Sequence, residues 1–445
     1  MLGAVAMATA LVLGGCGGGR TGDANHAATT SSASASSSAE SARDVATKTP
    51  EPTMDPVVLA ELERVSEFRG LPIKHHFKTV RLDRAAVLER TKTKMNEELP
   101  ADVLDWVAES LRALELLPID YDLTEGFLEL VTGRIAGFYD PDDKTMVLLD
   151  DLEDSQEEET LAHELVHALQ DQSFDLGAML DYKQGHGDES AAMQHLVEGD
   201  ATLAGMQLAN GPDFAPSIEQ MRRAFYTSTK LSQIGVGTPD ILIATLVSPY
   251  IDGYEFARQL QARSGWAGVN KAFERLPTTT EQVLHLDKYD AREAALVVPP
   301  ISPAALGAGF VVKLEDSNGE LGLKLMLEQW AARKTAAQAA AGWGGDRFAV
   351  AVRDKGPAGR EVAVAYYTRM DTTLDADELT AVLTSEFGTK CTERSDLGPL
   401  AWRRKDRDVV LVAGPYRQPG GVAGRITLSA GDCSTATAWL DALLK

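Results

Sequence analysis

The chain has 445 residues, which is enough for two or three domains that each bury a core of their own. Its 44% hydrophobic and 24% charged residues are typical of a globular protein. The formal net charge of -23, and a sequence without any basic patch, argue against nucleic acid as a partner.

The N-terminus predicts export. An apolar run, residues 1–13, is too short to span a bilayer and has the length of a signal-peptide core. It ends in Leu13-Gly14-Gly15-Cys16, which resembles the lipobox of bacterial lipoproteins, where the cysteine is acylated and becomes the mature N-terminus. We therefore predict a signal peptide over 1–16 and a lipid anchor on Cys16 that attaches the protein to a membrane of the bacterial cell envelope. The alternative, a plain secretory signal with an incidental cysteine, also predicts export.

Residues 17–54 are rich in Ser, Ala, Gly and Thr, and they offer too little apolar surface to fold. They predict a flexible linker, and order is expected from residue 55. The hydrophobic periodicity then predicts a helix around 58–65, a strand over 73–82, a helix over 83–98 and an amphipathic helix over 102–117.

Two short strands, 134–139 and 145–149, are predicted around a turn sequence at Asp140–Lys144. This hairpin directly precedes the most informative helix of the chain. The edge of such a hairpin can bind an extended peptide by strand addition, and a purely structural hairpin is an equal alternative.

The helix over 160–171 contains His163, Glu164 and His167, in the pattern H-E-x-x-H. Two histidines four residues apart project from the same face of a helix, where they can bind one Zn²⁺ ion. Glu164 can reach a water bound to that ion and act as a general base. The alternative is an ordinary helix that carries two histidines.

A catalytic zinc site needs a third protein ligand and an open fourth position. A second helix, from residue 188 or 189 to Asn210, contains Glu198, which we expect to be this ligand. His195 lies three residues earlier, can share the same face and is the rival ligand. Gly199 is expected to let the second helix pack closely against the first.

Four further residues can support such a site. Asp200 and Asp171 are candidates for the carboxylate that accepts a hydrogen bond from a ligating histidine, and surface positions are the alternative for both. His285 and Tyr139 can donate a hydrogen bond to an oxyanion, although a structural role is the simpler interpretation of each. We expect His285 to be catalytic.

Helices are also predicted over 216–228, 240–263 (with a break near Pro249 and Gly253) and 267–275. From residue 301 a long helix over 320–341 is followed by strands over 348–352, 362–367 and 409–413 and by helices over 376–387 and 435–444. We therefore predict an α+β fold with a smaller C-terminal α+β accessory domain over 301–445. Because export permits disulfides, Cys391 and Cys433 can form one there.

The motif His163-Glu-Leu-Val-His-Ala-Leu-Gln-Asp-Gln172, followed by Glu198-Gly-Asp-Ala201, resembles the gluzincin branch of zinc metallopeptidases. More narrowly, it is similar to bacterial exported metallopeptidase-like proteins. The resemblance implies a mainly helical zincin-like domain with a small sheet over 55–300, Zn²⁺ held by His163, His167 and Glu198, and Glu164 as general base. The pattern that surrounds the third ligand of thermolysin-like enzymes is absent, so their substrate rules do not apply.

The function expected from these observations is zinc-dependent hydrolysis of peptide bonds in a peptide or protein substrate. The alternative from another class is a non-catalytic, zinc-binding envelope lipoprotein that acts as a binding or scaffold module. Metal-dependent hydrolysis of a non-peptide amide is a third interpretation. The sequence does not indicate the oligomeric state.

Overall fold

A computed structural model describes residues 54–132, 136–151, 154–231, 237–420 and 425–445. Cys16, the signal peptide over 1–16 and nearly all of the linker over 17–54 lie outside the described residues, so the lipid anchor stays a prediction. Within the described ranges, no helix is both long enough and apolar enough to cross a membrane.

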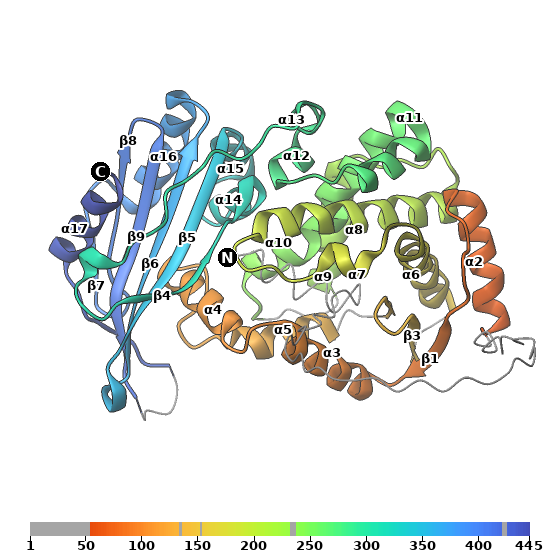
Figure 1. The fold of residues 1–445 in the computed structure, drawn as a ribbon, viewed down its shortest axis with the longest axis horizontal. Helices are drawn as coiled ribbons and strands as arrows, with labels where there is room; N and C mark the ends of the chain where they lie inside the picture. The colour runs from red at the N-terminus through yellow and green to blue at the C-terminus, as the bar shows by residue number, and fades with distance from the viewer. Residues whose placement is uncertain (1–53, 133–135, 152–153, 232–236, 421–424) are drawn as a thin grey trace, which may run out of the picture.

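The described residues up to 300 form a mainly helical body (Figure 1). Its helices are α2 (Pro56–Arg69), α3 (Arg84–Glu98), α4 (Val103–Ala113), α5 (Leu123–Thr132), α6 (Asp154–Phe174), α7 (Leu176–Leu180), α8 (Gly187–Asn210), α9 (Ile218–Leu231), α10 (Asp240–Ser248), the π-turn η1 (Pro249–Gly253), α11 (Tyr254–Glu274), α12 (Thr280–Leu284) and α13 (Leu286–Ala291).

A three-stranded sheet lies beside α6, with strand order β1-β3-β2. Its strands are β1 (Lys78–Leu82), β2 (Gly137–Asp140) and β3 (Thr145–Leu149). β2 and β3 form the predicted hairpin, and β1 pairs with β3 in parallel. β2 is therefore an edge strand of this sheet, and it packs against α6.

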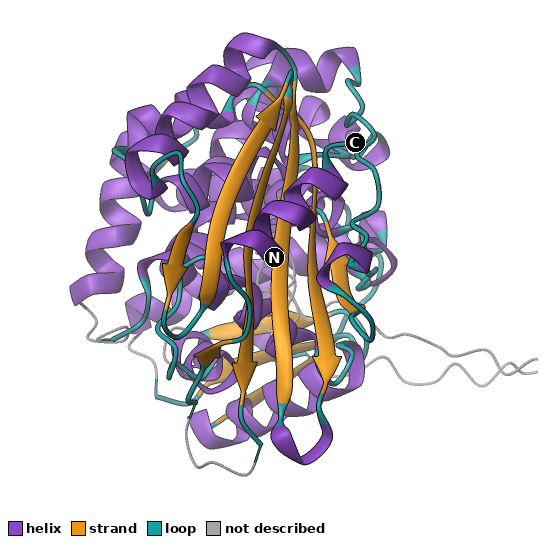
Figure 2. Cartoon of the chain, turned by 90° about the vertical axis from the view of Figure 1, so that its left-hand side faces the viewer, coloured by secondary structure: helices purple, strands orange, loops and turns teal. Residues whose placement is uncertain are grey.

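The C-terminal part is built on a second, antiparallel sheet with strand order β4-β5-β6-β9-β8-β7, and β10 pairs with β9 (Figure 2). Its strands are β4 (Val311–Asp316), β5 (Trp343–Asp354), β6 (Arg360–Met370), β7 (Thr392–Arg394), β8 (Gly398–Lys405), β9 (Asp408–Gln418) and β10 (Leu428–Ser429). Its helices are α14 (Gly319–Leu327), α15 (Arg333–Ala340), α16 (Thr373–Phe387) and α17 (Cys433–Leu443), and short 3-10 turns lie at Ala304–Leu306 and Gly356–Ala358.

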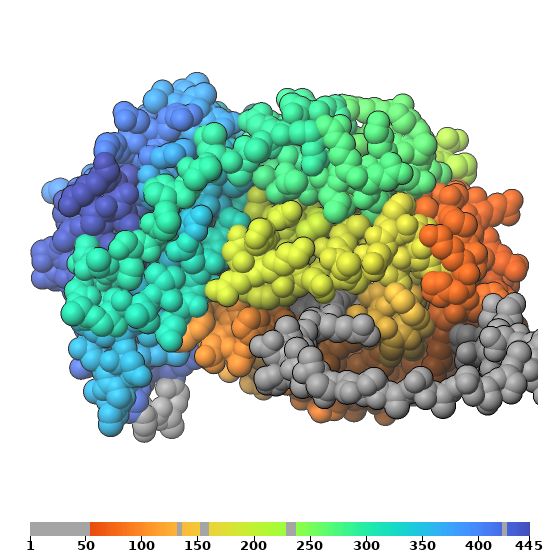
Figure 3. Space-filling model, in the orientation of Figure 1, coloured from red at the N-terminus to blue at the C-terminus, as the bar shows by residue number. Residues whose placement is uncertain are grey.

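Both faces of this sheet are covered. On one face, Val298, Ile301 and Phe310 pack with Trp439 of α17 against alternating alanines and valines of the central strands. Figure 3 shows the teal residues between α13 and β4 lying across the C-terminal sheet. The connection between the two parts of the chain therefore contributes to the core and is not a free linker.

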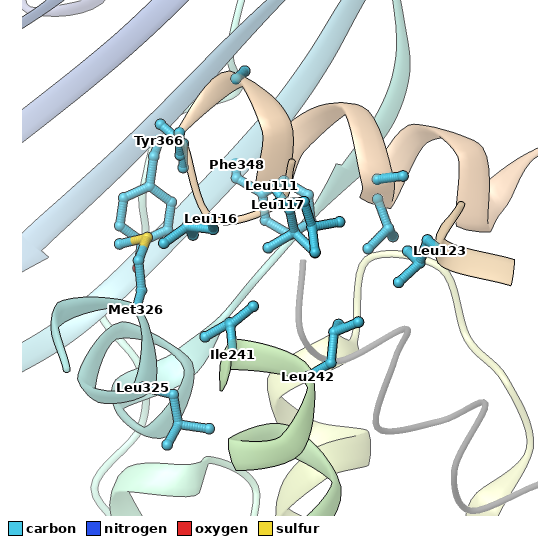
Figure 4. Close-up of a cluster of buried hydrophobic side chains, with 14 of the residues drawn as sticks. Leu111, Leu116, Leu117, Leu123, Ile241, Leu242, Leu325, Met326, Phe348 and Tyr366 are labelled. Carbon is cyan, nitrogen blue, oxygen red and sulfur yellow. The ribbon is translucent and has the colours of Figure 1, made fainter. Parts of the chain in front are cut away.

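The opposite face of the sheet shares one core with the helical body (Figure 4). α4 packs directly on β4, β5 and β6, although it belongs to the first 120 residues. The side chains that meet here include Leu111, Leu116, Leu117, Ile241, Leu242, Leu325, Met326, Phe348 and Tyr366. The domain boundary predicted at residue 300 stays a prediction, but the two parts bury apolar surface together.

The predicted α+β class is confirmed by this mixture of helices and two sheets. The single helix predicted over 320–341 is wrong, because α14 ends at Leu327 and α15 begins at Arg333. Trp330 lies in the break, where its ring packs edge-on against Phe387 of α16 at a centroid distance of 4.9 Å. Residues 328–332, between the two helices, contain neither Gly nor Pro, so the break has no local helix breaker. A disulfide joins Cys391 to Cys433.

The shared core gives a first prediction. Leu111 of α4 is fully buried, so Leu111→Ala should lower the free energy of unfolding by about 2–5 kcal/mol, measured by urea denaturation. Leu374 is 65% exposed, and Leu374→Ala is the control, with an expected change below ~0.5 kcal/mol. Equal stability of the two variants would mean that α4 is not part of the core.

Candidate metal centre

His163 and His167 lie one turn apart on α6, as their spacing predicts. The opposite side of α6 buries Leu161, Leu165 and Leu169 in an apolar cluster with β2, β3 and α2, which fixes the rotation of the helix. The two imidazole rings stand edge to face, and their Nε2 atoms lie 3.1 Å apart. Both Nε2 atoms therefore point at one place.

Glu198 of α8 completes the cluster. Its Oε2 lies 3.2 Å from Nε2 of His163 and 3.4 Å from Nε2 of His167. Ligands bound at about 2.0–2.1 Å in a tetrahedral zinc site lie roughly 3.3 Å from one another. The three donor atoms therefore have the spacing of three corners of such a tetrahedron, and their chemistry suits Zn²⁺.

The charges of the cluster are strongly coupled. Burial acts to raise the pKa of Glu198, but His167 and His163 outweigh it and lower this pKa to about 2. Burial acts to lower the pKa of His167, but the Glu198 carboxylate outweighs it and raises this pKa to about 9. Without a metal, Glu198 and His167 thus form a buried ion pair, and a bound cation displaces the proton of that pair.

Glu164 is buried next to the cluster. Its Oε2 accepts a hydrogen bond of 2.9 Å from the backbone N–H of Tyr139, at the edge of β2. Burial raises the pKa of Glu164 to about 7, although His167 and His163 act in the opposite direction. A carboxylate with this environment can take up and release a proton near neutral pH.

A chain of buried polar groups starts at Nδ1 of His167, on the other side of the ring from the Nε2 atom that faces Glu198. Its Nδ1 lies 2.8 Å from Oε1 of Gln170, whose Nε2 donates to Oδ2 of Asp200 at 2.8 Å. Arg69 of α2 in turn donates two hydrogen bonds to Asp200. Asp200 therefore supports His167 through Gln170 and not by direct contact. Gln170 was missed in the sequence, although its position three residues after His167 places it on the same helical face.

The described side-chain contacts of Asp171 are with the β2–β3 hairpin and not with a histidine ring. Its Oδ2 accepts hydrogen bonds from the Tyr139 hydroxyl at 3.0 Å and from Lys144 at 2.7 Å. The contacts of Asp171 thus join α6 to the β2–β3 hairpin. The side chain of Tyr139 is fully buried at this place. Neither residue has the position that the sequence suggested, as a histidine partner or as an oxyanion donor.

His285 and His195 lie outside the cluster. The Nε2 atom of His285 lies 2.8 Å from Glu320 of α14, so its contact is with the C-terminal part. His195 is buried, and its Nδ1 lies 2.6 Å from the carbonyl of Ala191 one turn earlier. The three residues that meet are therefore His163, His167 and Glu198, and the proposed catalytic contact of His285 has no counterpart among the described contacts.

The aromatic ring beside the cluster is Tyr250, which no sequence motif indicated. It lies on the π-turn η1 with its ring centroid 5.9 Å from that of His163, and it also stacks with Phe225 of α9. Gly199 packs its helix against this same turn, because a Cβ on Gly199 would lie 2.1 Å from the backbone of Gly253. The closest packing at Gly199 is therefore against η1, whereas the sequence suggested α6.

A second group of acidic residues and a cavity lie elsewhere in the described chain. Glu281, Glu293 and Asp371 could surround a cation, but the ammonium group of Lys288 already pairs with all three. A cavity of about 620 Å³ lies at the C-terminal sheet, where Trp106 and Arg360 line it.

The comparisons with known proteins do not cover the cluster. Residues 311–420 match the model of a family described as a domain of unknown function (DUF8575). This match spans β4 to β9 and does not include α6 or α8. No curated protein and no solved structure matches the chain.

Gln170 provides a test of the cluster. Gln170→Leu removes the partner of His167 Nδ1, and we expect it to weaken Zn²⁺ binding about 10–100-fold, measured by chelator competition. Gln207→Leu is the matched control. Gln207 is buried like Gln170, but it lies on α8 and pairs with Gln261. An unchanged affinity in the Gln170 variant would exclude its role in orienting His167.

Proposed function

We propose that this protein is a zinc-dependent metallopeptidase of zincin-like fold, in which His163, His167 and Glu198 hold the metal. The proposal rests on the triangle of donor atoms, with sides of 3.1, 3.2 and 3.4 Å. The resemblance of the motif to gluzincins supports the same ligands and the peptide substrate. His163 keeps 20% of its side chain exposed, so the cluster is accessible from one side.

Zinc, when bound, makes water a nucleophile near neutral pH and polarises the scissile carbonyl. Glu164 takes the proton of the attacking water and later delivers it to the leaving amine. The backbone N–H of Tyr139 holds Oε2 of Glu164, which fixes the orientation of the carboxylate during both transfers. The motif provides no side-chain nucleophile, so we expect no covalent intermediate.

The hairpin supports a peptide as the substrate. β2 is the edge strand of its sheet and lies against α6, and its residue Tyr139 binds the general base. An extended chain that pairs with this edge would run past Glu164 and the metal ligands. We therefore expect the substrate to be a peptide that binds by strand addition to β2. Cleavage of peptides by the protein tests this expectation.

Tyr250 is the side chain that we assign to the oxyanion of the attacked carbonyl. His285 pairs with Glu320, and Tyr139 donates to Asp171, so both residues expected from the sequence are engaged elsewhere. The ring of Tyr250 is partly exposed and lies beside His163. A phenol at this place can donate a hydrogen bond to the charge that develops in the transition state.

The general base provides the decisive test. Glu164→Gln should retain one Zn²⁺ per chain and lose about 10²–10⁴-fold in kcat, measured with a peptide library and metal analysis. His163→Ala should lose the metal as well as the activity. His186→Ala is the control, because His186 is exposed and its Nδ1 pairs with Glu189 three residues later.

Two outcomes would contradict the proposal. Unchanged turnover in Glu164→Gln would exclude Glu164 as the base. Zinc binding without cleavage of any peptide by the wild-type protein would favour the non-catalytic envelope lipoprotein instead.

Tyr250→Phe tests the oxyanion donor. Loss of the hydroxyl should lower kcat about 10²–10³-fold, with KM and zinc content close to those of the wild-type protein. Steady-state kinetics on one cleaved peptide measure this effect. A variant that changes KM alone would show that Tyr250 binds substrate and does not stabilise the transition state.

A further inference from the structure

The π-turn η1 connects the metal cluster to a buried ion network. It interrupts the helical path between α10 and α11, and turns of this type are often found at functional sites. Tyr250 of this turn lies beside His163, and Asp252, two residues later, is buried. One short turn thus carries a group at the cluster and a charge in the interior.

The turn also touches the ligand helix through its backbone. A Cβ on Gly253 would lie 2.1 Å from the carbonyl oxygen of His195, and one on Gly199 would lie 2.1 Å from the Gly253 carbonyl. Gly199 directly follows the ligand Glu198. A shift of η1 would therefore move both Tyr250 and the helical turn that presents Glu198.

Asp252 is held by two cations from different elements. Its Oδ1 accepts hydrogen bonds from Arg222 of α9 at 2.9 Å and from Lys324 of α14 at 3.1 Å. Burial acts to raise the pKa of Asp252, but Lys324 and Arg222 outweigh it and lower that pKa. The carboxylate is therefore ionised, and its buried position depends on both partners.

Lys324 comes from the C-terminal part of the chain. Only 6% of this residue is exposed, and it lies within residues 311–420, which match the domain of unknown function. The end of β4, just before α14, also contacts the start of α8, because Asp316 accepts a hydrogen bond from the backbone N–H of Gly187. The C-terminal part therefore contacts the framework of the metal cluster at two places, through Asp316 and through Lys324.

We propose that Lys324 is a positioning residue for the metal centre, which makes the C-terminal part an integral component of the catalytic unit. Lys324 pairs with Asp252, and Asp252 holds the π-turn that places Tyr250 beside His163 and supports Glu198. The consequence for catalysis rests on the proposed peptidase function, whereas the structural link does not.

Lys324→Met removes the charge and keeps most of the side-chain length. In the full chain, we expect kcat to fall roughly tenfold or more at an unchanged zinc content, because Tyr250 loses its position. Amide hydrogen exchange over 249–254 should become faster. Lys324→Arg should restore both properties, and Lys334→Met, an exposed lysine on α15, is the matched control.

Tyr250→Phe separates positioning from general stability. If Lys324 acts through Tyr250, Lys324→Met should lower kcat much less in the Tyr250→Phe background than in the wild-type protein. Full additivity of the two changes would overturn this route. Wild-type kcat in Lys324→Met would also overturn the catalytic role, whatever the exchange rate.

The exchange measurement distinguishes failure of this inference from failure of the proposed function. If the wild-type protein cleaves no peptide, faster exchange over 249–254 in Lys324→Met still supports the link between α14 and the π-turn. Wild-type exchange over these residues in that variant overturns the link, with or without peptidase activity.

Discussion

The meeting of α6 and α8 at three donor atoms is the constraint on which the rest of the site depends. Two imidazoles and one carboxylate lie 3.1–3.4 Å apart, which requires both helices to hold one rotation and one axial register. Apolar packing fixes the rotation of α6, and close backbone contact at Gly199 fixes the place of α8. A buried carboxylate between two imidazoles is also costly unless a proton or a metal ion compensates its charge, so the cluster requires one of the two.

Polar side chains around the cluster form hydrogen bonds, and these bonds join the cluster to neighbouring helices and to β2. Gln170 links His167 to Asp200, and Arg69 links Asp200 to α2. Tyr139 links Glu164, the proposed general base, to β2. Because His167 and Glu164 are supported by different elements, single substitutions in these supporting contacts should change metal affinity or rate and leave the fold intact.

The spacing of residues in the sequence predicted those parts of the site that lie on a single helix. The spacing of His163, Glu164 and His167 is a property of one helix, and the position of Glu198 follows from the need for a third ligand. Three features depend on how distant elements pack: the π-turn, the partner of Gly199 and the contact of His285 with Glu320. The spacing of residues along the sequence does not contain this information. The same holds for α14 and α15, where the break at Trp330 has no local helix breaker.

The position of α14 changes how the C-terminal part should be interpreted. Asp316, just before this helix, binds the first residue of α8, and Lys324 binds the π-turn that contacts Gly199. Asp316 ends β4 and Lys324 lies in α14, so residues 316–324 contact both the start of α8 and the turn beside Glu198. A segment with this role acts as a wall of the metal centre, so loss or rotation of the C-terminal sheet would be transmitted to Glu198 and Tyr250.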